Sequence, residues 1–266
     1  MGTVVDLRTE VIHRYVFELR YEFGQIYWDR AGRIAKKILT EQENWDFNTI
    51  DISRCQLARR SLNLAFSFGH EKLDLSQTQS ADVEELTPIQ EFATVAESTA
   101  SIVTENLEID SFPRIGFRTW LLYPAADRDE SYRLVRDLKL FTLDAAATER
   151  LGNLLEVSHT LVVERPSHML RIAVAPFEQQ VDLPPSVIRA AKARAKDYSR
   201  GQKRVQIDKL KAEKRIRHYP QCGLLLDFDA YIEDPPHPDE LPVSDFIADS
   251  FEDFQETKKV ILEASS

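Results

Sequence analysis

Residues 114–123 read Arg-Ile-Gly-Phe-Arg-Thr-Trp-Leu-Leu-Tyr, and this stretch decides the fold. Alternate positions are apolar or small, so one face of an extended strand would carry a continuous apolar row formed by Ile115, Phe117, Thr119, Leu121 and Tyr123. The opposite face would carry Arg114 and Arg118. One buried face and one wet face are typical of an antiparallel sheet.

Other segments repeat this alternation. The sequence predicts strands at residues 15–23 and 224–232, one hairpin at 61–75 with a turn at Gly69-His70, and a second hairpin formed by 159–164 and 169–177. Helical spacing of apolar residues predicts helices at 29–39, 88–107, 131–140, 185–217 and 243–262. Asp29 is the expected cap of the first helix, and Thr87 with Gln90 forms a capping box for the second.

The two halves of the chain show the same order of elements: a hairpin, a long helix, a strand and a terminal helix. The strands that start at Gly116 and Gly223 both end in a tyrosine, Tyr123 and Tyr231. We therefore expect an α+β fold of two similar lobes that arose by internal duplication, each a mostly antiparallel sheet with helices packed on one face. The expected lobes are 1–145 and 146–266, the second with a basic helical segment at 185–217.

Composition excludes several classes of protein. Two cysteines, Cys55 and Cys222, make no disulfide framework and no zinc-binding spacing. The sequence contains no glycine-rich phosphate loop, no apolar run of bilayer length and no signal-peptide pattern at its start. We expect a cytoplasmic protein with no cofactor and no membrane partner.

Charge is divided unevenly along the chain. The net charge is −10, yet residues 189–217 hold twelve Lys or Arg and only three Asp or Glu. Lys203, Arg204, Lys209 and Lys211 in this stretch could contact nucleic-acid phosphates. The stretch has few aromatic residues for base stacking, and the rest of the chain is acidic, so docking within the chain or on a protein partner is the favoured interpretation.

Asp227 and Asp229 are the candidate metal ligands. Residues two apart in a strand share a face, so both carboxylates could hold Mg²⁺ for nucleotidyl or phosphoryl transfer. The Gly-Ser turn that a nucleotidyltransferase carries upstream is absent, since Tyr219-Pro220-Gln221-Cys222 stands there. The alternative is a strand with acidic residues on its wet side.

Arg114 and Arg118 are candidate anion-binding residues, because they share a strand face across Gly116, where a ligand or another backbone could approach closely. The favoured alternative is pairing with the carboxylates of the protein itself. Histidine chemistry has little support. Ser167 and His168 are neighbours, and neighbouring side chains in a strand point apart, so no Ser-His-Asp triad is expected.

Four segments follow one another in a recognisable order: the strand at 15–23, the motif Arg114-Ile115-Gly116-Phe117-Arg118, the motif Leu224-Leu225-Leu226-Asp227-Phe228-Asp229, and a last helix with several Phe residues. This order resembles that of a sporadically distributed prokaryotic family of similar length and unknown function. The family tends to continue its Arg-Gly-Arg strand with Tyr and Asn, whereas this chain has Thr119, Trp120 and Leu121. The resemblance implies an accessory role and no activity.

No acid, base, nucleophile and metal set clusters in the sequence. The leading hypothesis is therefore a non-enzymatic protein that binds another protein or itself. Nucleic-acid binding through residues 189–217 and metal-dependent phosphotransfer at Asp227 and Asp229 are the alternatives.

Overall fold

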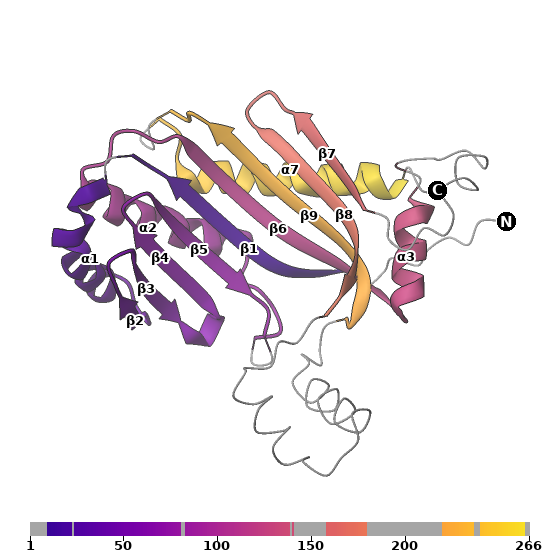
Figure 1. Cartoon of the computed structure of the whole chain (residues 1–266), viewed down its shortest axis with the longest axis horizontal. Coiled ribbons are helices and arrows are strands. Elements are labelled where there is room, and N and C mark those ends of the chain that lie inside the picture. The colour runs from indigo at the N-terminus through magenta and orange to yellow at the C-terminus, as the bar shows by residue number, and fades with distance from the viewer. Residues whose placement is uncertain are drawn as a thin grey trace, which may run out of the picture.

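The computed structural model describes residues 10–22, 24–80, 83–138, 140, 158–179, 220–236 and 240–263 (Figure 1). Over these residues the protein is an α+β structure with one antiparallel sheet of nine strands and four α-helices. The spatial order of the strands is β2-β3-β4-β5-β1-β6-β9-β8-β7. The predicted α+β class is confirmed.

The strands are β1 (Val11–Arg20), β2 (Asp46–Ile50), β3 (Arg54–Arg59), β4 (Leu64–Gly69), β5 (Lys72–Thr78), β6 (Arg114–Ala125), β7 (His159–Glu164), β8 (Met169–Glu178) and β9 (Cys222–Glu233). The α-helices are α1 (Tyr27–Glu41), α2 (Ile89–Leu107), α3 (Arg128–Asp137) and α7 (Val243–Glu263). The predicted hairpins, the strands β6 and β9 and the helix α7 are all present.

The sheet is continuous where the sequence suggested two sheets. β6 and β9 pair over twelve residues each, from Arg114 opposite Glu233 to Ala125 opposite Cys222. Strands from both halves of the chain therefore join one sheet, because each of these long strands offers the other a complete set of backbone partners. The boundary at residue 145 and the internal duplication stay predictions, and the basic segment 185–217 lies outside the described residues.

Two helix starts differ from the sequence prediction. α1 begins at Tyr27, two residues before Asp29, which lies in its first turn and does not cap it. α2 begins after Pro88 without a side-chain cap. The hydroxyl of Thr87 instead donates to Gln77 Oε1 at 2.8 Å, so a tertiary contact with β5 replaces the expected capping box.

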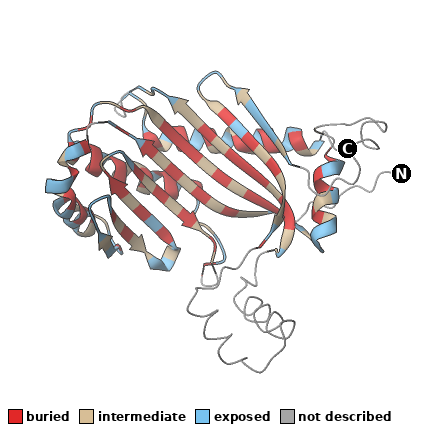
Figure 2. Cartoon of the chain, viewed as in Figure 1, coloured by how far each residue is buried: buried red, intermediate tan, exposed pale blue. Residues whose placement is uncertain are grey.

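The alternation read from the sequence divides the sheet into two faces. On one face, Tyr15 of β1 contacts the rings of Phe92 in α2 and Phe251 in α7, with ring centroids 5.3 and 5.9 Å apart. Phe228 of β9 and Phe254 of α7 lie closer still, at 4.3 Å. Figure 1 shows α2 and α7 behind the sheet, and Figure 2 shows buried and partly buried residues alternating along its strands.

A partly buried charge cluster ties the last helix to the residue before β1. Lys258 of α7 is 8% exposed, and its Nζ lies 3.0 Å from both carboxylate oxygens of Glu10. Tyr123 of β6 donates to Glu10 Oε2 at 3.1 Å. Burial and the Glu10 charge both raise the pKa of Tyr123, so this phenol stays a hydrogen-bond donor.

Among the described helices, none has the length and apolar character needed to cross a membrane.

Two glycines of the β6–β9 pair give a matched test of how closely these two strands pack. A Cβ at Gly223 would lie 2.2 Å from the backbone oxygen of Tyr123, whereas one at Gly116 would meet nothing closer than 3.6 Å. We expect Gly223→Ala to lower the free energy of unfolding by about 2 kcal/mol or more and Gly116→Ala to change it by less than about 1 kcal/mol. Urea unfolding of both variants measures this, and equal effects would contradict the pairing.

Candidate functional site

The face of the sheet opposite α2 and α7 is rich in charge. We call it the charged face and define it by the alternate residues of five central strands: Lys72 and Asp74 of β5, Arg14, Val16, Glu18 and Arg20 of β1, Arg114, Gly116, Arg118 and Trp120 of β6, Asp227, Asp229 and Tyr231 of β9, and Arg171 of β8. The register places these side chains in rows that cross the strands. All four described helices bury their apolar residues in the clusters on the other face.

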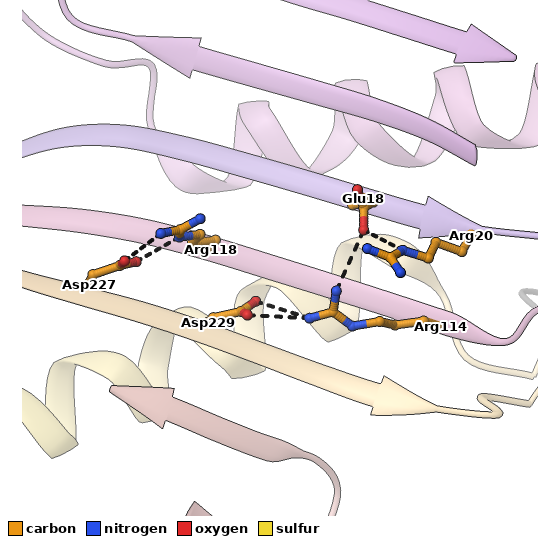
Figure 3. A network of polar contacts seen from close by, with 6 residues as sticks. All are labelled: Glu18, Arg20, Arg114, Arg118, Asp227 and Asp229. Carbon is orange, nitrogen blue, oxygen red and sulfur yellow. Dashed lines mark hydrogen bonds and ion pairs between the residues drawn. The ribbon is translucent and has the colours of Figure 1, made fainter. Parts of the chain in front are cut away.

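Arg118 and Asp227 form the tightest pair of the charged face. The Nε of Arg118 donates to Asp227 Oδ1 at 2.7 Å, and its Nη2 donates to Oδ2, so the contact is bidentate (Figure 3). The Asp227 side chain is 11% exposed and that of Arg118 is 41% exposed. The hydrogen bonds with Asp227 raise the pKa of Arg118, which secures its charge.

Arg114 lies along its own strand and passes beside Gly116. Its guanidinium carbon lies 3.8 Å from the position of a Cβ at Gly116 and 4.7 Å from the centre of the Tyr231 ring. From there Nη2 lies 3.3 Å from Asp229 Oδ2, and Nη1 lies 3.5 Å from Glu18 Oε1 (Figure 3). The close approach that the sequence assigned to Gly116 is made by the protein's own arginine.

Glu18 is the acceptor that joins three strands. Its carboxylate accepts from Lys72 of β5 at 2.7 Å and from Arg20 at 2.8 Å, besides its contact with Arg114. Burial alone would raise the pKa of Glu18, but the hydrogen bonds from Lys72 and Arg20 outweigh it and lower this pKa. Glu18 therefore stays ionised and offsets the repulsion between the cations around it.

Four of the eight site candidates from the sequence thus come together as two ion pairs. The expected pairing of Arg114 and Arg118 with the protein's own carboxylates is confirmed. Burial raises the pKa of Asp229, although Arg114 and Arg118 oppose this shift. In the described part of the chain, no three His, Cys, Asp or Glu side chains converge as a metal site. Mg²⁺ at Asp227 and Asp229 would have to displace both guanidinium groups, and this site stays a prediction.

Trp120 is the centre of a cluster that the sequence did not indicate. The guanidinium carbons of Arg14 and Arg118 lie 5.1 and 5.3 Å from the centre of its ring. The His13 ring stacks on it at 6.0 Å. Burial and the nearby Arg14 charge lower the pKa of His13 to about 4, so the imidazole is neutral at pH 7. The sequence signal that could have identified Arg14 and Glu18 is their place among the polar alternate positions of β1.

A second polar chain lies at the β7–β8 turn. Ser167 Oγ is 3.1 Å from His168 Nδ1, and His168 Nε2 is 3.2 Å from Asp253 Oδ2 of α7. The prediction that the Ser167 and His168 side chains point apart was wrong. Both residues precede the first residue of β8, so the alternation of side chains along a strand does not apply to them. Arg165 Nε contacts the same Asp253 oxygen at 3.2 Å, so we interpret the cluster as an anchor of the hairpin on α7.

A cavity of about 710 Å³ lies apart from the charged face, between α2 and the start of α7. Its lining includes Thr94, Glu97, Ser101 and Ser244. Glu97 accepts from the backbone N–H of Ser244 at 2.9 Å and so caps α7. None of the candidate residues from the sequence lines this cavity. Lys203, Arg204, Lys209 and Lys211 lie outside the described residues.

No family model matches this chain, and a search of curated proteins finds no match. The resemblance to a prokaryotic family of unknown function therefore stays a prediction. The functional argument rests on the geometry of the charged face.

The bidentate pair of the charged face allows a double-mutant cycle. We expect Arg118→Gln and Asp227→Asn to show a coupling energy of about 1.5 kcal/mol in urea unfolding, because the carboxylate is nearly buried while the arginine is partly screened. The exposed pair Arg133–Glu130 on α3 is the control, with an expected coupling of about 0.4 kcal/mol. Equal couplings would show that the charged face is as solvated as α3.

His13 predicts a pH dependence of stability. The unfolded chain binds a proton on His13 near pH 6.5, whereas the folded protein resists protonation until about pH 4. Acidification through this window therefore favours the unfolded state, by up to about 3 kcal/mol. Denaturant unfolding at several pH values, compared with His13→Asn, isolates this contribution. A variant with the same pH profile as the wild type would contradict the assignment.

Proposed function

We propose that this protein is a non-enzymatic binding protein that recognises another protein through the charged face. The observation that carries the proposal is the Trp120 cluster. Trp120 and Tyr231 lie beside Arg14, Arg118 and Arg114 on a sheet face that points away from the described helices. Tryptophan, tyrosine and arginine are the residues that dominate the binding energy of protein interfaces.

The electrostatics of the face favour binding over catalysis. Arg118 is held by Asp227, and Arg114 is held by Glu18 and Asp229, so these groups neutralise one another. A general base or nucleophile needs a poised, unpaired group close to a substrate cavity. None of the charged-face residues lines the cavity between α2 and α7, so the proposal assigns no reaction to the charged face.

A protein partner fits this face better than a nucleic acid does. Nucleic-acid affinity depends on cations that are free to contact phosphates, and the chain as a whole carries a net charge of −10. The basic segment 189–217 keeps nucleic-acid binding as a second candidate, because its local charge has the opposite sign. A gel shift that weakens with salt and is lost when Lys203, Arg204, Lys209 and Lys211 become Ala would support it.

We also propose that the two halves of the chain derive from one ancestral unit. The antiparallel pairing of β6 with β9 is compatible with a two-fold relation between equivalent strands. In each half a hairpin precedes the central strand. β1 lies between β5 and β6 but has no counterpart between β8 and β9 in the described sheet, so the proposed duplication includes the insertion of β1.

Peptide selection tests the proposed function without a known partner. A random peptide library displayed on phage is panned against the wild-type protein, Trp120→Ala and Trp28→Ala. Trp28 is the matched control, since it is 57% exposed on α1, outside the charged face. We expect peptides that bind the wild type and Trp28→Ala with similar affinity and bind Trp120→Ala at least about tenfold more weakly.

The selected peptides are then measured by fluorescence anisotropy, with thermal melts to confirm that each variant is folded. Peptides that bind Trp120→Ala as tightly as the wild type would remove the charged face as the recognition surface.

A further inference from the structure

Among the half-buried arginines of the charged face, Arg14 is the one without an ion pair in the described structure. Arg114 and Arg118, the other two half-buried arginines of this face, each contact a carboxylate. Across the described residues, no carboxylate oxygen forms an ion pair with Arg14, whose contact is with the ring of Trp120. A half-buried guanidinium with no acceptor is costly, and native structures seldom retain one without a reason.

Unused donors lie side by side at this point. The Nε of Arg14 and the indole Nε1 of Trp120 are both buried and have no hydrogen-bond acceptor in the described structure. Arg14 and Trp120 are direct neighbours in the pairing of β1 with β6. Burial and the repulsion from Arg118 lower the pKa of Arg14, and the charges of Asp74 and Asp227 offset these two effects only in part.

Asp74 and Asp227 attract Arg14 through their charges, but neither forms an ion pair with it in the described structure. Both oxygens of Asp227 are taken by Arg118. Asp74 accepts a hydrogen bond from Ser67 at 2.9 Å. His13 is neutral at pH 7 because its pKa is about 4. The Arg14 guanidinium therefore has room for a further negative charge placed directly against it, which would stabilise the cation.

We propose that Arg14 and Trp120 form a subsite for a single carboxylate, supplied by an Asp or Glu side chain of the protein partner. The inference rests on the proposed function, because it names the chemistry that the partner presents. A carboxylate suits the subsite better than a phosphate group, since Asp227 lies opposite Trp120 in the sheet and repels the second charge of a phosphate. The carboxylate would accept from the outer N–H groups of the guanidinium, and its charge would then lie close to the Trp120 indole.

The three tryptophans of the chain make the test specific. Trp45 Nε1 donates to Gln42 and Trp28 Nε1 donates to Ile52, each at 3.0 Å, so both indoles already have acceptors. Trp120 is the one whose indole has none in the described structure. In a ¹⁵N-labelled protein the indole N–H signals are recorded separately, and Trp120→Phe assigns the Trp120 signal by its loss.

The probe is Nα-acetyl-glutamate amide, which carries one side-chain carboxylate, with Nα-acetyl-glutamine amide as the neutral control at equal ionic strength. We expect a saturable shift of the Trp120 signal with the glutamate compound, no such shift with the glutamine compound, and unmoved Trp28 and Trp45 signals. Arg14→Gln should abolish the shift while the Trp28 and Trp45 signals show that the variant is folded.

Other outcomes would overturn the inference. A Trp120 shift that persists in Arg14→Gln, or that glutamine amide produces equally, would remove the carboxylate subsite. Inorganic phosphate that binds more tightly than the glutamate compound would reverse the choice of a carboxylate and point to a phosphorylated partner.

The selected peptides separate this inference from the proposed function. Peptides that carry an essential Asp or Glu and bind Arg14→Gln roughly tenfold to a hundredfold more weakly would support both. Trp120-dependent peptides without an acidic requirement would overturn the subsite and leave the function standing. A glutamate-dependent Trp120 shift without any Trp120-dependent peptide would sustain the subsite and count against protein recognition.

Discussion

The pairing of β6 with β9 is the constraint on which the rest of the structure depends. It joins strands from the two halves of the chain over twelve residues and fixes their register at every position. That register places Phe117, Leu121 and Phe228 toward the helices and every charged residue of these strands toward the other side. A slip by one residue would exchange the two faces, so the apolar core and the charged face are set by one event.

The charged face is stabilised mainly by diagonal contacts between neighbouring strands rather than by contacts between directly opposite residues. Directly opposite residues include like charges, such as Arg20 facing both Lys72 and Arg114. The side chains avoid this conflict by turning toward carboxylates one or two rows away, and Glu18 collects three of the cations. Directly opposed like charges destabilise a sheet, so these diagonal contacts are what make so dense a charge tolerable.

Much of this fold could be predicted from local patterns, because a strand with one apolar and one solvent-facing side shows apolar and polar residues in alternation. β6, β9 and both hairpins were found in this way. The same patterns do not predict β2, because Asp46–Ile50 is short, largely exposed and carries a bulge, so it has no clear alternation. The pairs of the charged face join residues more than a hundred positions apart, such as Arg118 and Asp227, and no local signal specifies such partners. Thr87 shows the same effect on a smaller scale, since its contact with Gln77 overrides the capping rule.

The contact of Lys258 with Glu10 spans 248 positions of the chain. During synthesis, β1 emerges early, yet its neighbour β6 and the ammonium group that neutralises Glu10 are made much later. Contacts of such long sequence separation form slowly, because a large loop must close before they repay its entropy. The central strand β6 therefore stays unpaired to β9 until the second half of the chain has been made. For a sheet with so many apolar residues on one face, the interval before α7 arrives is the period of greatest risk of aggregation.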